Sequence, residues 1–282
     1  QWGTEDQKEK FLPQLTTGEK LWAFGLTEEN AGSDARGTET EATLKNGEWV
    51  INGKKRYITN GSVDINAGIT LQVITGLENG HKELSTILVE RSREGFSSER
   101  MYGKLMWRSA DTARLWFDNV RVPESNMLGE KGKGARYMLE TLDGGRLSVA
   151  AMGVGLAQGA FEMALDYSKK RIQFDRPISK NQAIKFKLAD MDLKIELARE
   201  FLYKACWLKD QGKPFSRESA MAKLYSSEIA REVADEALQI FGGAGLFKES
   251  PIERFYRDQR LLQIGEGTSE ILRWVISRQL GV

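Results

Sequence analysis

Residues 184–205 read IKFKLADMDLKIELAREFLYKA and have the apolar pattern of one long amphipathic helix. The apolar positions recur at alternating intervals of four and three residues: Ile184, Leu188, Met191, Ile195, Ala198, Leu202 and Ala205. Side chains at these intervals lie on one face of a helix. A single apolar face of this length is typical of a bundle, in which it packs against other helices.

Helical segments are predicted on both sides of this stretch. Residues 135–170 carry several glycines, which favour close packing against a neighbour although each lowers helix propensity. A further helix is predicted over residues 216–241, ending at Gly242-Gly243. Another begins after Glu266, where Thr268 or Ser269 is placed to cap it. The pattern therefore predicts a four-helix bundle over residues 131–282.

Residues 40–122 instead have the short alternating runs of β-strands. Strands are predicted at residues 43–45, 48–51, 55–58, 69–74, 86–89 and 113–117. The Asn-Gly pairs at 46–47 and 52–53 are typical of hairpin turns and are expected to separate the first three strands. Several short strands at this spacing indicate a sandwich or barrel-like domain, assigned to residues 24–130.

Residues 1–23 differ from both parts. Residues 5–12 are expected to form the end of a helix with no obvious partner elsewhere in the chain. We interpret residues 1–23 as the remnant of a preceding helical domain. The predicted fold class is thus α+β, with a β domain followed by a helical bundle.

Composition excludes several classes of function. The 282 residues include 41 basic and 40 acidic side chains, and this net charge of +1 argues against nucleic-acid binding. The longest charge-free apolar stretch, residues 147–161, is too short to cross a membrane. With no signal peptide visible, we expect a protein of the cytoplasm or an organelle matrix. One cysteine and one histidine exclude a disulfide and a multi-histidine metal site, so no metal is expected.

Acid–base chemistry must then come from carboxylates, lysines or tyrosines. Glu266 stands between Gly265 and Gly267, directly before a predicted helix. A carboxylate held out on such a thin loop suits a general base. Taken alone, the same octapeptide, residues 264–271, favours the simpler reading of a solvated acid on a glycine-flanked loop.

Four other segments could bind a ligand, and each of them also has an ordinary structural explanation. The loop at residues 25–37 offers backbone N–H groups and hydroxyls to a phosphate, or is a plain connection. Tyr57 and Thr59 share one side of a strand, which suits stacking on a ring and hydrogen bonding to it, or a structural role. The glycine cluster at 242–245 and the cationic segment 171–177 would also fit simple helix ends.

Together and in this order, these segments resemble the acyl-CoA dehydrogenase family. The stretches 25–37 and 239–258 match its two diagnostic patterns, and residues 142–146 (Leu-Asp-Gly-Gly-Arg), 171–174 and 266–268 fall where the family has equivalents. The resemblance covers the whole chain, except that the family's N-terminal helical domain is represented only by residues 1–23. It implies an FAD-dependent enzyme that acts on an acyl-CoA thioester.

The resemblance implies roles for individual residues. FAD is expected between the two domains, and its predicted contacts are Leu26, Thr27, Ser33, Tyr57, Thr59, Arg171, Phe174, Gln182, Gln239, Gly243, Thr268 and Glu270. Some of these, such as Arg171 and Gln239, resemble residues that reach the cofactor of a neighbouring subunit, which implies a homotetramer. Asp143 and Arg146 match positions that contact CoA. Glu266 would remove the α-proton while the β-hydrogen leaves as hydride to flavin N5.

Two positions depart informatively from the family pattern. Some relatives carry the catalytic Glu just before the arginine of the first long helix, and Gly145 occupies that place here. Gly265 stands where many members have a Tyr that lines the acyl pocket, so we expect a branched or cyclic acyl group.

Several alternatives to this reading stay open. The resemblance implies an electron-transfer flavoprotein as acceptor of the electrons. The alternatives are an acyl-CoA oxidase that uses oxygen and a non-catalytic or nucleic-acid-binding relative.

Overall fold

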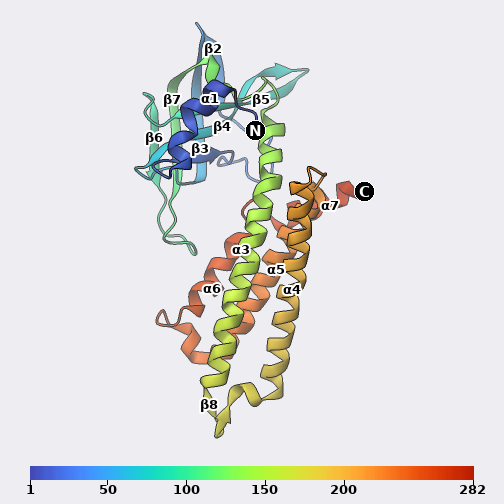
Figure 1. The fold of residues 1–282 in the computed structure, drawn as a ribbon. Coiled ribbons are helices and arrows are strands. Elements are labelled where there is room, and N and C mark those ends of the chain that lie inside the picture. Colours follow the sequence, from blue (N-terminus) through green and yellow to red (C-terminus); the bar gives the residue numbers. More distant parts are fainter. The chain divides into compact units, whose positions relative to one another are not determined.

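The computed structural model describes all residues 1–282, which form two compact units. The first unit comprises residues 1–104 and 108–141, and the second comprises residues 105–107 and 142–282. Strands dominate the first unit and helices the second (Figure 1). The predicted fold class, a β domain followed by a helical domain, is confirmed.

The β domain is built on one seven-stranded mixed sheet. Its strands are β1 (Leu21–Gly25), β2 (Glu41–Lys45), β3 (Glu48–Thr59), β4 (Asn66–Glu78), β5 (His81–Glu90), β6 (Phe96–Arg100) and β7 (Thr112–Pro123). The order is β1-β4-β2-β3-β7-β6, with β5 also paired to β4. β4 pairs in parallel with β1 and β2, and the other pairs are antiparallel. Alternate apolar side chains from the central strands, such as Ile51, Leu71 and Ile87, form its core.

The predicted turn at Asn52-Gly53 is wrong, because β3 continues through it from Glu48 to Thr59. The pairing of β3 with β7 shifts register between Ile51 and Gly53. A Cβ at Gly53 would lie 2.6 Å from Oγ1 of Thr40, and Gly53 has φ +150°. The glycine therefore permits a β-bulge in β3 and lets Thr40 pack close to its backbone, as glycines inside strands often do. Asn46-Gly47 does join β2 and β3 as predicted.

The N-terminal segment forms α1 (Glu5–Phe11) and α2 (Pro13–Thr16). The predicted helix is confirmed, but the expectation that it lacks a partner is wrong. Gln7 Nε2 donates to two carbonyls beyond β7, those of Ser125 and Met127, each at 2.8 Å. Phe11 is buried against Trp22, with ring centroids 5.2 Å apart. Gln7 and Phe11 are four residues apart, so one face of α1 makes both contacts.

The second unit is a helical bundle. Its helices are α3 (Gly134–Lys170, which begins in the first unit), α4 (Gln182–Asp210), α5 (Ser216–Phe241), α6 (Ile252–Asp258) and α7 (Ser269–Gln279). A two-stranded ribbon of β8 (Ile172–Gln173) and β9 (Arg176–Pro177) joins α3 to α4. Short 3-10 turns complete the chain: η1 (Glu124–Asn126), η2 (Ile178–Lys180), η3 (Gly242–Leu246) and η4 (Gln259–Gln263). The ribbon and α7 lie at opposite ends of the bundle (Figure 1).

The bundle core follows the predicted apolar stripe of α4. Six of its seven positions, all but Ile184, are buried. The glycines of α3 allow close helix packing, because a Cβ at Gly153 would lie 2.9 Å from the carbonyl oxygen of Ser226 on α5. The backbones of α3 and α5 therefore meet at this point, which holds the two helices in a defined register.

By length and composition alone, α3 is apolar enough to cross a membrane. Its most apolar 18-residue window is 44% buried within the structure. This is weak evidence for a membrane span, because the core helix of a globular bundle has the same properties.

Candidate active site

Glu266 lies on the loop between η4 and α7, in the second unit. Its backbone has φ +56° and that of Gly267 has φ +97°, so two successive residues adopt left-handed conformations. A non-glycine residue rarely does so, and such strain clusters at functional sites. Thr268 caps α7 by accepting a hydrogen bond from the N–H of Ile271 at 3.3 Å, as predicted. The carboxylate is therefore held on a sharply bent loop at the start of α7.

The Glu266 carboxylate lies against the backbone of α3. A Cβ at Gly145 would be 2.9 Å from Oε2 of Glu266, so the carboxylate occupies the space of a side chain at position 145. The next residue, Arg146, is 4% exposed and donates to Oδ1 of Asp143 at 2.5 Å. Its Nε is buried without a hydrogen-bond partner. Glu266, Asp143 and Arg146 are thus brought together with an unsatisfied donor beside them, which a polar ligand atom could satisfy.

Burial sets the protonation of this cluster. Desolvation raises the pKa of Glu266 above its ordinary value, and the positive charges of Arg146 and Lys223 oppose this rise. Desolvation likewise lowers the pKa of Arg146, although Asp143 and Glu266 favour its charged form. A carboxylate with a raised pKa is a better match to a general base near neutral pH than an exposed one.

The sequence analysis did not single out two residues on α5 that support this loop. Lys223 is completely buried and donates to the carbonyl oxygen of Gly267 at 2.6 Å. Glu228 accepts from Ser269 Oγ at 2.7 Å and from Gln263 Nε2 at 2.9 Å. A sequence signal for Lys223 exists, because its neighbours at three and four residues are all small: Ser219, Ala220, Ser226 and Ser227. A lysine on such a closely packing face is buried.

The other predicted cofactor residues of this unit lie at the opposite end of the bundle. They are exposed and surround the ends of α3 and α5: Arg171, Phe174, Gln182, Gln239 and Gly243. Tyr167 stacks on Phe241 with centroids 4.2 Å apart, which brings those two helix ends together. Arg146 and Arg171 are separated by about 37 Å along α3, at 1.5 Å per residue. Thr268 and Glu270 instead accompany Glu266 at the start of α7.

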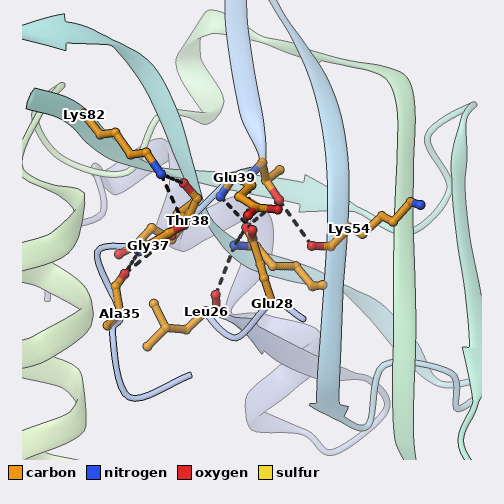
Figure 2. A network of polar contacts seen from close by, with 11 residues as sticks. Leu26, Glu28, Ala35, Gly37, Thr38, Glu39, Lys54 and Lys82 are labelled. Carbon is orange, nitrogen blue, oxygen red and sulfur yellow. Dashed lines mark hydrogen bonds and ion pairs between the residues drawn. The ribbon is translucent and has the colours of Figure 1, made fainter. Parts of the chain in front are cut away.

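In the first unit, a buried ion pair shapes the loop at residues 25–37. Lys55 Nζ lies 2.7 Å from Oε1 of Glu28 and donates to the carbonyl oxygen of Leu26 at 3.1 Å. Glu28 also accepts from the N–H groups of Glu39 and Thr40 (Figure 2). Burial raises the pKa of Glu28, but Lys55 and the hydrogen bonds outweigh this and hold it below its ordinary value.

The far side of the same loop is anchored to β4 and β5. Lys82 Nζ donates to the Thr38 carbonyl at 2.8 Å, and Gln72 Nε2 donates to the Ala35 carbonyl at 2.6 Å (Figure 2). Ser33, at the loop tip, is exposed. Buried side chains therefore hold both ends of the loop, Glu28 and Lys55 at one end and Gln72 at the other, while its tip stays open to a ligand.

The predicted aromatic and hydroxyl pair lies beside that loop. Tyr57 and Thr59 are exposed and Ile58 between them is buried, as strand alternation predicts. The Thr27 carbonyl accepts from the N–H of Arg56 at 2.9 Å, so Leu26 and Thr27 are held next to Tyr57. Tyr57 is 56% exposed and has φ +60°, which is unusual for a bulky residue. An exposed ring held by strained backbone is suited to stacking on a planar ligand.

Comparison with known proteins identifies the family. The model for the acyl-CoA dehydrogenase middle domain matches residues 23–120, and that for the acyl-CoA dehydrogenase C-terminal domain matches residues 132–281. The chain belongs to the acyl-CoA dehydrogenase family. A probable acyl-CoA dehydrogenase of Bacillus subtilis is 48% identical over 279 residues, which cover 99% of this chain and 73% of the relative.

Solved structures agree in both fold and sequence. Butyryl-CoA dehydrogenase from Megasphaera elsdenii has a TM-score of 0.96 at 44% identity, covering 100% of this chain and 73% of that one. A chain in a structure described as the electron-transferring flavoprotein of Acidaminococcus fermentans has a TM-score of 0.95 at 43% identity. The match covers 99% of this chain and 73% of that one. A glutaryl-CoA dehydrogenase of Mycobacterium smegmatis, in complex with FADH2, has a TM-score of 0.93 at 29% identity. The match covers 99% of this chain and 70% of that one.

FAD is the cofactor of this family, and the residues of the present acyl-CoA dehydrogenase fit it. In the first unit the exposed Tyr57 ring lies beside residues 26–27 of the loop, and the loop tip at Ser33 is also exposed. In the second, Phe174 is 94% exposed, and a Cβ at Gly243 would meet nothing within 4 Å. Arg171 and Gln239 are exposed, and neither side chain forms a hydrogen bond or ion pair within the chain. These side chains are therefore free to bind a polar cofactor.

Proposed function

We propose that this protein oxidises an acyl-CoA thioester to the α,β-unsaturated thioester, with Glu266 as the general base. The observation that carries the proposal is the placement of the Glu266 carboxylate: it is partly buried, rests on the glycine backbone at position 145 and is bordered by Arg146 and Lys223. A base in these surroundings can take a weakly acidic α-proton from a thioester and hold it.

Each residue of the cluster has a separate contribution. Burial raises the pKa of Glu266 toward working pH, which increases its basicity as a carboxylate. The positive charges of Arg146 and Lys223 favour the ionised carboxylate and so oppose this rise in pKa. The buried Nε of Arg146 and the Asp143 carboxylate would orient the CoA portion of the substrate.

FAD, when bound, would accept the β-hydrogen as a hydride, so that the proton on Glu266 and the hydride together account for the two hydrogens removed. Leu26, Thr27, Ser33, Tyr57 and Thr59 would hold the flavin and pyrophosphate portion, with Thr268 and Glu270 in the same cofactor-binding stretch as Glu266. Arg171, Phe174, Gln182, Gln239 and Gly243 lie too far from Glu266 along the bundle to serve the same cofactor. We therefore propose that they reach the FAD of a neighbouring subunit in a homotetramer.

An electron-transfer flavoprotein is the proposed acceptor of the electrons. The similarity to a chain from the Acidaminococcus fermentans structure supports this choice. An acyl-CoA oxidase is the alternative, and it differs in producing hydrogen peroxide from oxygen during turnover.

The acyl group is proposed to be short, and branched or cyclic. The similarity to butyryl-CoA dehydrogenase supports a short chain. Gly265 supports a branched or cyclic acyl group, because this position could carry a side chain but does not. A Cβ there would be in ordinary contact with Leu261, 3.6 Å from its Cδ1. A Cβ at position 265 would therefore fit the fold, and the absence of a side chain there would leave more space for the acyl group.

Mixing the purified flavoprotein with a panel of acyl-CoAs under anaerobic conditions tests the reaction. Loss of the flavin's 450 nm absorbance with one or more thioesters is expected, and retention of that absorbance with every thioester would overturn the proposal. Repeating the reaction in air and measuring peroxide separates a dehydrogenase from an oxidase.

A further inference from the structure

Lys223 is a buried ammonium that the proposed reaction does not itself require. It lies on α5, is completely inaccessible to solvent and makes one hydrogen bond, to the carbonyl oxygen of Gly267 at 2.6 Å. Burying a charge is costly unless it is compensated. The compensation here comes from the loop that carries Glu266, one residue before Gly267.

Glu228, on the same helix, forms hydrogen bonds with the loop on either side of Glu266. Its carboxylate accepts from Gln263 Nε2, three residues before Glu266, and from Ser269 Oγ, three residues after it. With the Lys223 bond to Gly267, α5 holds this short loop at three points. Both left-handed residues of the loop, Glu266 and Gly267, lie between the outer two points.

The helix that supplies these contacts is itself held against α3. The close approach of Gly153 to Ser226 joins the two backbones three residues after Lys223 and eight after Gly145. Because interiors are close-packed, α5 cannot move closer to α3 or slide along it here without a steric clash. The loop anchor on α5 and the glycine surface on α3, on which the Glu266 carboxylate rests, therefore form one rigid frame.

We propose that Lys223, assisted by Glu228, is a positioning residue that fixes the Glu266 carboxylate against Gly145 in the orientation needed for proton removal. This inference rests on the proposed role of Glu266 as the base. Lys223 acts through the loop backbone and through its charge, and it does not contact the substrate.

The charges around Lys223 agree with this role. Burial and the charge of Arg146 on α3 lower the pKa of Lys223 to about 8. Three carboxylates favour its charged form: Glu266 on the loop, Glu228 on α5 and Glu270 on α7. Lys223 is therefore largely protonated at pH 7. Its charge in turn lowers the pKa of Glu266. Removal of the charge should raise the pKa of the base and, with it, the pH at which the reaction reaches half of its maximum rate.

The test compares Lys223→Met with Arg231→Met, a control on an exposed position of the same helix. In Lys223→Met, the rate of anaerobic flavin reduction should fall roughly ten- to a hundredfold at pH 7, as for a misplaced catalytic group. The pH midpoint should move upward. Amide hydrogen exchange of a peptide covering residues 264–270, measured on the purified protein without substrate, should become faster. Arg231→Met should match the wild type in all three.

An unchanged pH midpoint together with unchanged exchange in Lys223→Met would overturn the proposal. If Lys223→Met does not fold, Lys223→Gln replaces it, because it keeps a hydrogen-bond donor and removes the charge, and the same upward pH shift is expected. Glu266→Gln, run in parallel, separates the two claims. Normal flavin reduction in Glu266→Gln would refute the base assignment, whereas the exchange measurement still decides whether Lys223 holds the loop.

Discussion

The carboxylate of Glu266 occupies the space that a side chain at position 145 would need. The two are 121 residues apart in sequence, yet a Cβ on Gly145 would lie 2.9 Å from Oε2 of Glu266. Gly145 is also the position where some family members carry their catalytic glutamate. The geometry shows that the Glu266 carboxylate, in the position it takes here, requires a residue without a Cβ at position 145.

Gly145→Ala should separate stability from activity. Alanine raises helix propensity by about 1 kcal/mol relative to glycine, so folding is expected to be retained. The new methyl group displaces the Glu266 carboxylate, and a misplaced base should slow flavin reduction about a hundredfold. Thermal unfolding and anaerobic flavin reduction measure the two effects. An alanine variant as fast as the wild type would show that the carboxylate works from another position.

Replacing only one member of the buried Lys55–Glu28 pair in the β domain should lower the stability of the protein more than replacing both. Lys55→Met leaves the buried Glu28 without its ammonium partner and should destabilise the protein by about 3–5 kcal/mol. FAD content should also fall, because the Leu26 carbonyl loses its donor. Adding Glu28→Gln to Lys55→Met should recover much of the stability. Urea unfolding of both variants checks this, and a single variant of wild-type stability would contradict it.

Acid should weaken the anchoring of α1 through Glu90. Burial alone raises the pKa of Glu90, but hydrogen bonds from Arg93 and Lys10 lower it to about 2. Because the folded pKa is below the unfolded value of about 4.3, this stabilisation is complete above about pH 5 and is lost as the pH falls toward 2.

The variant Glu90→Gln measures that contribution. It should be less stable than the wild type by about 1–2 kcal/mol at pH 6, after allowance for screening at a half-buried site. The difference should shrink steadily between pH 5 and pH 2. A stability difference that does not change with pH would assign the effect to packing and not to charge.

Gly265→Tyr tests the acyl pocket. Gly265 does not require a positive φ, and its Cβ would be 3.5 Å from the carbonyl oxygen of Leu261, so the loop accepts a side chain. The ring should slow flavin reduction by branched or cyclic acyl-CoAs about tenfold or more relative to straight-chain ones. Gly265→Ala serves as the control for the Cβ alone. Equal effects on all three substrate classes would count against a pocket at this position.

The sequence predicts elements best where the pattern is long. The seven-position stripe of α4 and the start of α7 at Thr268 follow from spacing and capping, and both are present. β1 and β6 were not predicted, because β1 (LWAFG) is apolar throughout and shows no alternation, and β6 (FSSER) lacks an apolar face. The Asn52-Gly53 error has a different cause: the dipeptide favours a turn locally, but the approach of Thr40 places its glycine inside a strand.

In the candidate site, only the residues that lie in local sequence motifs could be predicted from the sequence. Glu266 and its flanking glycines stand out as a local pattern, and so does the loop that contains Glu28. Lys55 does not, because lysines are ordinarily exposed and its burial depends on packing between distant segments. The small neighbours of Lys223 indicate that it is buried, but its contact with Gly267 depends on packing between segments far apart in the sequence. Likewise, the left-handed backbone of Tyr57 arises from a register shift in β3 that no single residue type signals.

The rate of flavin reduction in Glu266→Gln, measured anaerobically in a single turnover with butyryl-CoA or the best thioester of the panel, tests the central claim most directly. Glutamine keeps the shape of the side chain and its place against Gly145 but cannot take the proton. FAD binding should be retained and the rate should fall roughly 10²–10⁴-fold, the usual contribution of a positioned base. Reduction at the wild-type rate in Glu266→Gln would contradict the assignment.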